Sequence, residues 1–127
     1  QLLIGRTHMA FKLAIGNKVG IKVEGEYSDA AGAVKPYSLV LECDRLTAEE
    51  IEAEQTKEGG TFAGFFAAHT SGWRDQTLVL GDDDQPAPYS AEALACAMAV
   101  PGFAVAAYQA YLAQVGVRQK NSLKPRA

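Results

Sequence analysis

The side chains that could support catalysis are few and scattered along this chain. His69 is the one histidine beyond the first eight residues, and it lies in the segment FAGFFAAHTSGW, residues 62–73. A hydrolytic nucleophile needs an adjacent base and a third group that orients the base. No Gly-x-Ser-x-Gly motif accompanies His69. The pattern favours a histidine packed in the core or at its edge over a catalytic base.

The acidic triplet of Asp82, Asp83 and Asp84 is the clearest candidate for a metal site. An EF-hand calcium loop has glycine at its sixth position and glutamate at its twelfth. Counted from Asp82, those positions hold Ala87 and Ala93, so the spacing predicts a solvated turn. The glycines of residues 16–20 precede a strand and not a helix, so they lack the helix N-terminus of a phosphate site. We expect no metal and no cofactor.

Cys43 and Cys96 both lie in apolar stretches and do not form a CxxC pair. The pattern favours two buried free thiols in a reducing compartment. A disulfide between them depends on their distance and stays open. An enzyme or ligand-binding domain would need a deep pocket lined by Cys43, His69 or the Asp82 turn. We expect no catalytic residues and predict that the protein is not an enzyme.

The composition is that of an ordinary globular domain. Of the 127 residues, 48% are hydrophobic and 21% are charged, and the net charge is -3. This balance argues against electrostatic capture of nucleic acid or of an anionic membrane. No apolar run approaches the roughly 20 residues that span a bilayer. We expect a cytoplasmic protein.

Three parts are expected along the chain. Residues 1–8 resemble a leader added by cloning, because they end in a histidine that is followed by a start-like methionine, a pair typical of a cloning junction. Residues 9–117 are predicted to form a single α+β domain. Residues 118–127 are basic and without periodicity, and we expect a flexible tail.

The N-terminal third has the period-two alternation of β-strands. Every second residue is a large apolar one over residues 11–15 and again over 19–24, and turn residues separate these two runs. A third alternating run covers residues 37–43. The pattern predicts an antiparallel three-stranded meander over residues 10–44.

The chain then changes to helical spacing. Thr47 and Glu50 form a predicted capping box for a helix over residues 48–57. The aromatic spacing predicts a second helix over residues 61–73, with a strand as the open alternative. The fold is therefore expected to pack the meander against three to four short helices.

The last third predicts two helices separated by a proline. Residues 77–80 form a short β-type run, and Ser90 is the expected N-cap of a helix over residues 91–99. Pro101 is expected to begin a second helix, over about residues 102–115, with Gly116 as its C-cap.

Aromatic residues are the candidates for contact with a partner protein. A domain of this size has limited room to bury five Phe, five Tyr and one Trp, and large exposed apolar side chains often mark interfaces. Core packing is the simpler explanation of the stripe, but it does not exclude an interface. The predicted contact residues are Phe62, Phe65, Phe66 and Trp73, followed by Tyr108 and Tyr111.

From about residue 44 onward, the order of motifs resembles the tail assembly chaperones of long-tailed bacteriophages and prophages. The matching motifs, in chain order, are Leu46-Thr47-Ala48-Glu49-Glu50, Gly72-Trp73, Asp82-Asp83-Asp84-Gln85-Pro86, Tyr89-Ser90-Ala91-Glu92-Ala93-Leu94, Val100-Pro101-Gly102, Ala107-Tyr108-Gln109-Ala110-Tyr111 and Lys120-Asn121. Each motif is weak alone, and their order carries the resemblance. The chain departs from the family at Gln85, where a glycine is usual, and in its longer meander.

The resemblance implies a non-catalytic role in the cytoplasm of a bacterial host. Such chaperones hold the tape-measure protein soluble until tail tube subunits polymerise around it. The partners implied are therefore the tape-measure protein and the tail tube protein, while a homo-oligomer stays open. The long meander also supports an alternative, a structural virion component such as a tail tube or tail completion protein. That protein would self-assemble through its strand edges.

Overall fold

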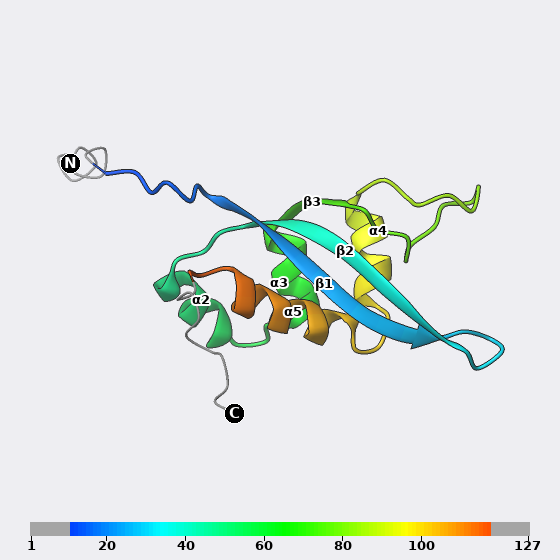
Figure 1. The fold of residues 1–127 in the computed structure, drawn as a ribbon. Helices are drawn as coiled ribbons and strands as arrows, with labels where there is room; N and C mark the ends of the chain where they lie inside the picture. The colour runs from blue at the N-terminus through cyan, green and yellow to red at the C-terminus, as the bar shows by residue number, and fades with distance from the viewer. Residues whose placement is uncertain (1–10, 118–127) are drawn as a thin grey trace, which may run out of the picture.

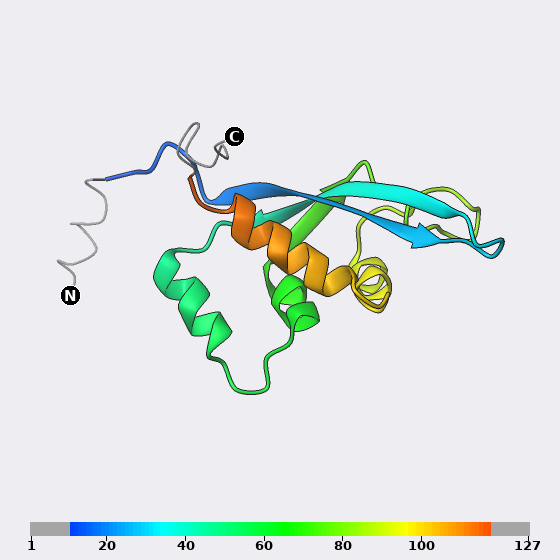
Figure 2. The same ribbon diagram turned by 60° about the horizontal axis from the view of Figure 1, so that its bottom comes forward.

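The computed structural model describes residues 11–117 as a sheet with helices on one side (Figure 1). The elements in chain order are β1 (Lys18–Ser28), β2 (Val34–Asp44), α2 (Ala48–Gln55), α3 (Phe62–His69), β3 (Thr70–Arg74), α4 (Ala91–Met98) and α5 (Phe103–Gln114). Figure 2 shows the helices beneath the sheet. The predicted α+β class, with a three-stranded antiparallel sheet and short helices, is confirmed. The predicted leader (residues 1–8) and tail (residues 118–127) lie outside the described residues.

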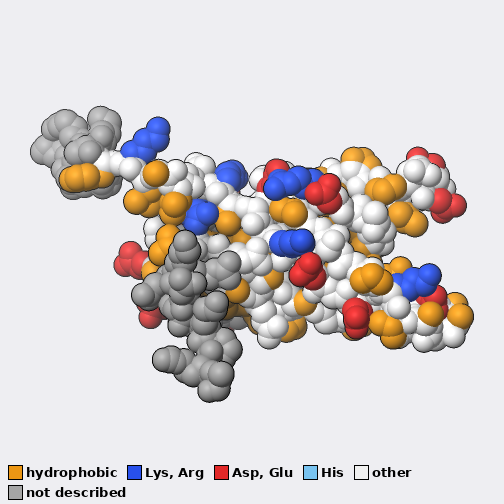
Figure 3. Space-filling view, in the orientation of Figure 1, with side chains coloured by type: hydrophobic (Ala, Val, Ile, Leu, Met, Phe, Trp, Pro, Cys, Tyr) orange, Lys and Arg blue, Asp and Glu red, His pale blue; other side chains and the backbone are white. Residues whose placement is uncertain are grey.

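The alternation of apolar and polar residues in β1 and β2 gives the sheet two different faces. The buried residues of the two strands lie directly opposite one another, in the pairs Val19–Cys43, Ile21–Leu41 and Val23–Leu39. The opposite face carries charged side chains of both signs (Figure 3), including the ion pair of Lys22 with Glu24. A period of two therefore places the core on one face and solvent on the other.

The third strand differs from the predicted one. β3 pairs with β2 after a bulge between Glu42 and Cys43. A helix was predicted over residues 61–73, but α3 ends at His69 and the residues that follow belong to β3. Residues 11–15 belong to no strand, and the Gly16 N–H donates to the Leu13 carbonyl at 3.4 Å in a turn. The predicted hairpin between residues 11–15 and 19–24 is therefore wrong.

The outer edge of β1 explains why that hairpin does not form. The Lys22 N–H donates to Oε1 of Gln114 at 2.9 Å, and the Lys22 carbonyl accepts from its Nε2 at 2.9 Å. The amide of Gln114, in the last turn of α5, thus takes the place of a residue in a neighbouring strand. Residues 11–15 would have to displace it in order to pair with β1.

Two helices begin at caps that the sequence predicted. The Thr47 hydroxyl accepts from the Glu50 N–H, and the Glu50 carboxylate accepts from the Thr47 N–H, which completes the capping box of α2. Ser90 caps α4 by accepting from the Ala93 N–H. Pro101, expected to begin the last helix, instead lies two residues before the start of α5 at Phe103.

The end of α5 has also moved from the expected position. The C-cap is Val115, whereas Gly116 was expected to hold it. The predicted β-type run of residues 77–80 contributes only an isolated bridge between Leu80 and Pro86 within the described part of the chain. The shift of the C-cap is by one residue, which is usual at a helix end.

The loop between β3 and α4 is fixed by a buried amide. Gln76 is 5% exposed, and its Nε2 donates to the carbonyls of Val79 and Ala87 while its Oε1 accepts from the Val79 N–H. The indole N–H of Trp73 donates to the same Ala87 carbonyl at 3.2 Å. Because buried backbone groups need partners, these contacts tie the loop to the sheet.

Tyr111 of α5 connects the helices to the end of β2. Its ring is 0% exposed and packs edge-on against Phe65 and Phe66 of α3. Its hydroxyl donates to the Asp44 carbonyl at 2.8 Å and accepts from the Leu46 N–H at 3.2 Å. One phenol therefore satisfies both backbone groups where the chain leaves the sheet.

Among residues 11–117, no single helix has both the length and the apolar composition needed to cross a membrane. α4 and α5 meet that criterion only when taken together, across a bend of 103°. Both helices bury apolar side chains in the core, including Met98 of α4 and Phe103 of α5.

Replacing Tyr111 with phenylalanine should lower the free energy of unfolding by about 1–3 kcal/mol, the usual cost of leaving buried backbone groups unsatisfied. The ring, and hence its packing on α3, is retained. Tyr27→Phe is the matched control, because Tyr27 is 43% exposed and should change stability by less than about 0.5 kcal/mol. Urea unfolding of both variants measures the difference, and equal stabilities would contradict the role of the buried hydroxyl.

Candidate functional site

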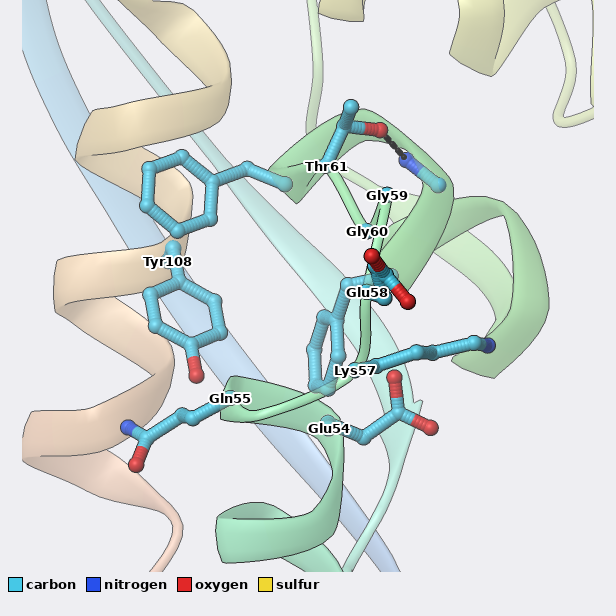
Figure 4. Close-up of a pocket in the computed structure, with 11 residues that line it drawn as sticks. Glu54, Gln55, Lys57, Glu58, Gly59, Gly60, Thr61 and Tyr108 are labelled. Carbon is cyan, nitrogen blue, oxygen red and sulfur yellow. Dashed lines mark hydrogen bonds between the residues drawn. The ribbon is translucent and has the colours of Figure 1, made fainter.

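A hollow of about 500 Å³ opens between the end of α2, the loop after it, the start of α3 and one face of α5 (Figure 4). Tyr108 of α5 faces Glu54 and Gln55 of α2 across it. The loop turns at Gly59, whose φ of +76° suits glycine. The Thr61 hydroxyl then accepts from the Gly64 N–H at 2.9 Å and begins α3.

Aromatic rings form one side of the hollow. Phe62 of α3 stacks on Tyr108 with ring centroids 4.6 Å apart and planes inclined by 19°. Phe65 meets the same tyrosine edge-on at 5.3 Å. Phe62 remains 42% exposed, whereas Tyr108 is 8% exposed. The hollow therefore presents an accessible ring on a buried aromatic support.

The six predicted contact residues differ in burial. Phe62 is exposed and Trp73 is half-buried against Tyr89, whereas Phe65, Phe66, Tyr108 and Tyr111 are buried. The structure gathers all of them except Trp73 in one aromatic cluster between α3 and α5. A partner that binds this conformation can reach Phe62, and contact with the fully buried rings would require the core to open. Partner binding by these residues stays a prediction.

An acidic helix forms the opposite wall, and sequence analysis did not assign it a role at the site. Residues 48–60 contain five glutamates and a single lysine, Lys57. α2 has no fully buried side chain, and Ile51 is its partly buried contact with the core. The density of glutamate was the available signal, but the helix dipole by itself also favours acidic residues such as Glu49 and Glu50 in a first turn.

His69 links this wall to the sheet. Its Nδ1 lies 3.3 Å from Oδ2 of Asp44, and its Nε2 lies 3.3 Å from Oε2 of Glu54. The ring also packs on Phe65, and 18% of the side chain is exposed. A protonated imidazole donates to both carboxylates, whereas the neutral ring donates to one. The predicted packed histidine at the core edge is found here, with two acidic partners.

The other groups considered for catalysis or metal binding do not line this hollow. The Cys43 thiol is buried at 3.7 Å from the Thr70 hydroxyl. Asp83 and Asp84 sit in an exposed turn, where the Asp83 carboxylate accepts from the Gln85 N–H. Within residues 11–117, no group of three or more His, Cys, Asp or Glu side chains could hold a metal ion.

The ion pairs of Asp44 predict a loss of stability in acid. The hydrogen bond from Lys18, at 2.7 Å, and the weaker one with His69 together hold the pKa of Asp44 below its ordinary 3.8. A lowered pKa stabilises the fold above the ordinary value, and this contribution disappears as the pH falls through the folded-state pKa. The side chain is 40% exposed, so solvent screening makes the effect modest.

Wild type should therefore lose more stability than Asp44→Asn when the pH is lowered from 7 to 3. Urea unfolding at both values measures the two losses. Lys18→Gln removes the main partner, so it should shrink the pH-dependent contribution of Asp44 while keeping the carboxylate. Identical pH profiles for wild type and Asp44→Asn would exclude this coupling.

The two cysteines should differ sharply in reactivity. Both are free, but only Cys43 is buried, so the prediction of two buried thiols is wrong for Cys96, which is exposed on α4. Burial raises the pKa of Cys43 to about 11, which depletes its reactive thiolate. A maleimide should modify one thiol in the native protein and both in denaturant, as mass spectrometry would show. Modification of Cys43 in the folded state would contradict its burial.

Comparison of the chain with protein-family models, with curated proteins and with solved structures found no match in any of the three. The resemblance to phage tail assembly chaperones therefore rests on the ordered motifs of residues 46–121.

Proposed function

We propose that this protein is a phage tail assembly chaperone that binds the tape-measure protein without catalysis. Two features support the proposal. The first is the order of motifs from Leu46 onward, which resembles that family. The second is the exposed ring of Phe62 at the edge of a hollow formed largely by helices.

Phe62 is the observation that carries the proposal. A phenylalanine that is 42% exposed leaves apolar surface in water, at a cost of roughly 25 cal/mol for each Å². Its stacking on Tyr108 fixes the ring in place, so a partner that covers it meets a preorganised contact. Aromatic anchors of this kind are enriched among the residues that dominate binding energy.

A surface of this kind suits a helical client. The tape-measure protein is extended and helical, and its exposed apolar seams are prone to aggregate. An amphipathic helix places apolar residues on one side, which can lie against a surface presented by α3 and α5. Covering such seams reversibly requires binding energy and no chemical step. Tail tube subunits are the second proposed partner, and the cytoplasm of a bacterial host is the proposed location.

The alternative is a structural virion component that assembles through strand edges. The exposed apolar side chains of Phe11, Leu13 and Ile15, next to the edge strand β1, favour it. The Gln114 amide opposes it, because that side chain occupies the backbone groups of Lys22 at the middle of the edge. Strand addition there would first have to break two hydrogen bonds.

Co-expression with the tape-measure protein of the same phage or prophage tests the chaperone proposal. The client should be soluble and co-purify only when this chain is present. Phe62→Ser should reduce the co-purified client several-fold, because the accessible anchor is lost. Phe11→Ser is the matched control, since Phe11 is 82% exposed outside the hollow, and it should leave the yield unchanged.

The opposite pattern would favour the structural alternative. In that case the client stays insoluble, and the purified chain alone forms rings or tubes in size-exclusion chromatography and electron microscopy. Phe11→Ser would then disrupt the assemblies while Phe62→Ser would not. The two substitutions therefore separate the two functions with the same pair of proteins.

A further inference from the structure

A second hollow lies on the outer surface of α3 and α4. It has a volume of about 450 Å³, and its lining includes Ala63, Gly64, Ala67, Leu94, Ala95 and Met98. Within the described part of the chain, no charged residue contributes to this lining. Small side chains such as Ala67 and Ala95 are exposed along the two walls. A groove with low walls lets the backbone of another helix approach closely.

The two hollows meet at α3. Gly64 lines both of them, and its neighbours Phe62 and Ala63 line one each. The first hollow, beside Phe62 and Tyr108, is called the aromatic hollow below, and the second is called the α3–α4 groove. Because Gly64 has no side chain, no side chain projects between the two at that residue. An α-helix of about 20 residues is about 30 Å long, so one helix can contact both.

The joined surface is charged at one end only. Glu54 and Glu58 line the aromatic hollow together with Lys57, whereas the α3–α4 groove is uncharged. Within residues 11–117, Glu58 forms no ion pair, so its carboxylate is available to a partner. The exposed face of Phe62 also attracts cations, because an aromatic ring carries negative charge density on its face.

We propose that the aromatic hollow and the α3–α4 groove form one docking surface for a partner helix with an apolar stripe and a cationic end. The apolar stripe lies in the groove, and the cationic end lies over Phe62 and the glutamates of α2. This inference rests on the proposed chaperone function and specifies the chemistry of the client segment. The segment is a basic amphipathic helix, since an acidic one would meet like charge at α2.

Two synthetic helical peptides of about 20 residues test the proposal with the purified full chain. Both have the same leucine stripe, and one ends in lysines where the other ends in glutamates. Fluorescence anisotropy should show the lysine-ended peptide binding at least about tenfold more tightly at low salt, with the difference shrinking as salt screens the charges.

Matched variants locate the two ends of the peptide. Ala95→Glu and Ala67→Glu place a charge on either wall of the groove and should weaken both peptides about tenfold or more. Glu58→Gln should weaken only the lysine-ended peptide, by about two- to threefold. The controls are Ala113→Glu and Glu26→Gln, at exposed positions outside both hollows, and they should change neither affinity. Thermal unfolding confirms that each variant folds.

Three results would overturn the inference. Equal affinity for the two peptides would exclude the proposed contact of a cationic end with α2 and Phe62. Unchanged affinity in both groove variants would exclude binding in the α3–α4 groove. Light scattering could also show that the wild type is a dimer and that Ala95→Glu makes it dissociate. That result would assign the groove to a second copy of this chain. The peptides are tested without the client. If neither peptide binds but the tape-measure protein is still solubilised, this inference is wrong and the chaperone proposal stands.

Discussion

The buried hydroxyl of Tyr111 is the contact on which the arrangement of sheet and helices depends. It satisfies the Asp44 carbonyl and the Leu46 N–H at the point where the chain leaves β2 and turns toward α2. Its ring holds α3 through Phe65 and Phe66. A buried group with two hydrogen bonds and a packed ring tolerates little displacement. The positions of α3, α5 and the start of α2 are therefore fixed together.

The C-terminal end of α2 is held less firmly than these elements. Its first turn is held by the capping box and by Leu46, but it has no fully buried side chain. Its later part is attached through Glu54, which lies against His69. Elements with few buried apolar contacts open at the lowest free energy. The acidic wall of the hollow is thus the part of the helical layer best able to adjust to a partner, while the aromatic side is held by the core.

Local signals in the sequence predicted the helices better than the sheet. Thr47, Glu50 and Ser90 fixed two helix starts, because caps depend on residues three positions apart. The alternation at Phe11, Leu13 and Ile15 has the correct period for a strand, but a strand also needs a free partner edge. Gln114, about ninety residues away in sequence, occupies that edge, and no local pattern reveals it. Residues 70–74 pair with strand β2, whose partner residues lie about thirty positions earlier in the sequence. Local aromatic spacing does not reveal that pairing, so it predicted a helix that runs too far.

The site was predictable only in part, and the reason is the competition between core and surface for aromatic residues. Spacing identified the stripe from Phe62 to Trp73 but could not say which rings face inward. Folding places Phe65, Phe66 and Tyr111 in the core. Phe62, the first residue of α3, stacks on Tyr108 of α5 but stays 42% exposed. The middle of the β1 edge is occupied by Gln114, and the open sheet face carries charged side chains of both signs. On the helical side, Phe62 and the α3–α4 groove present apolar surface. A partner that recognises this fold through apolar contact therefore has more to gain from α3 and its neighbours than from the strands.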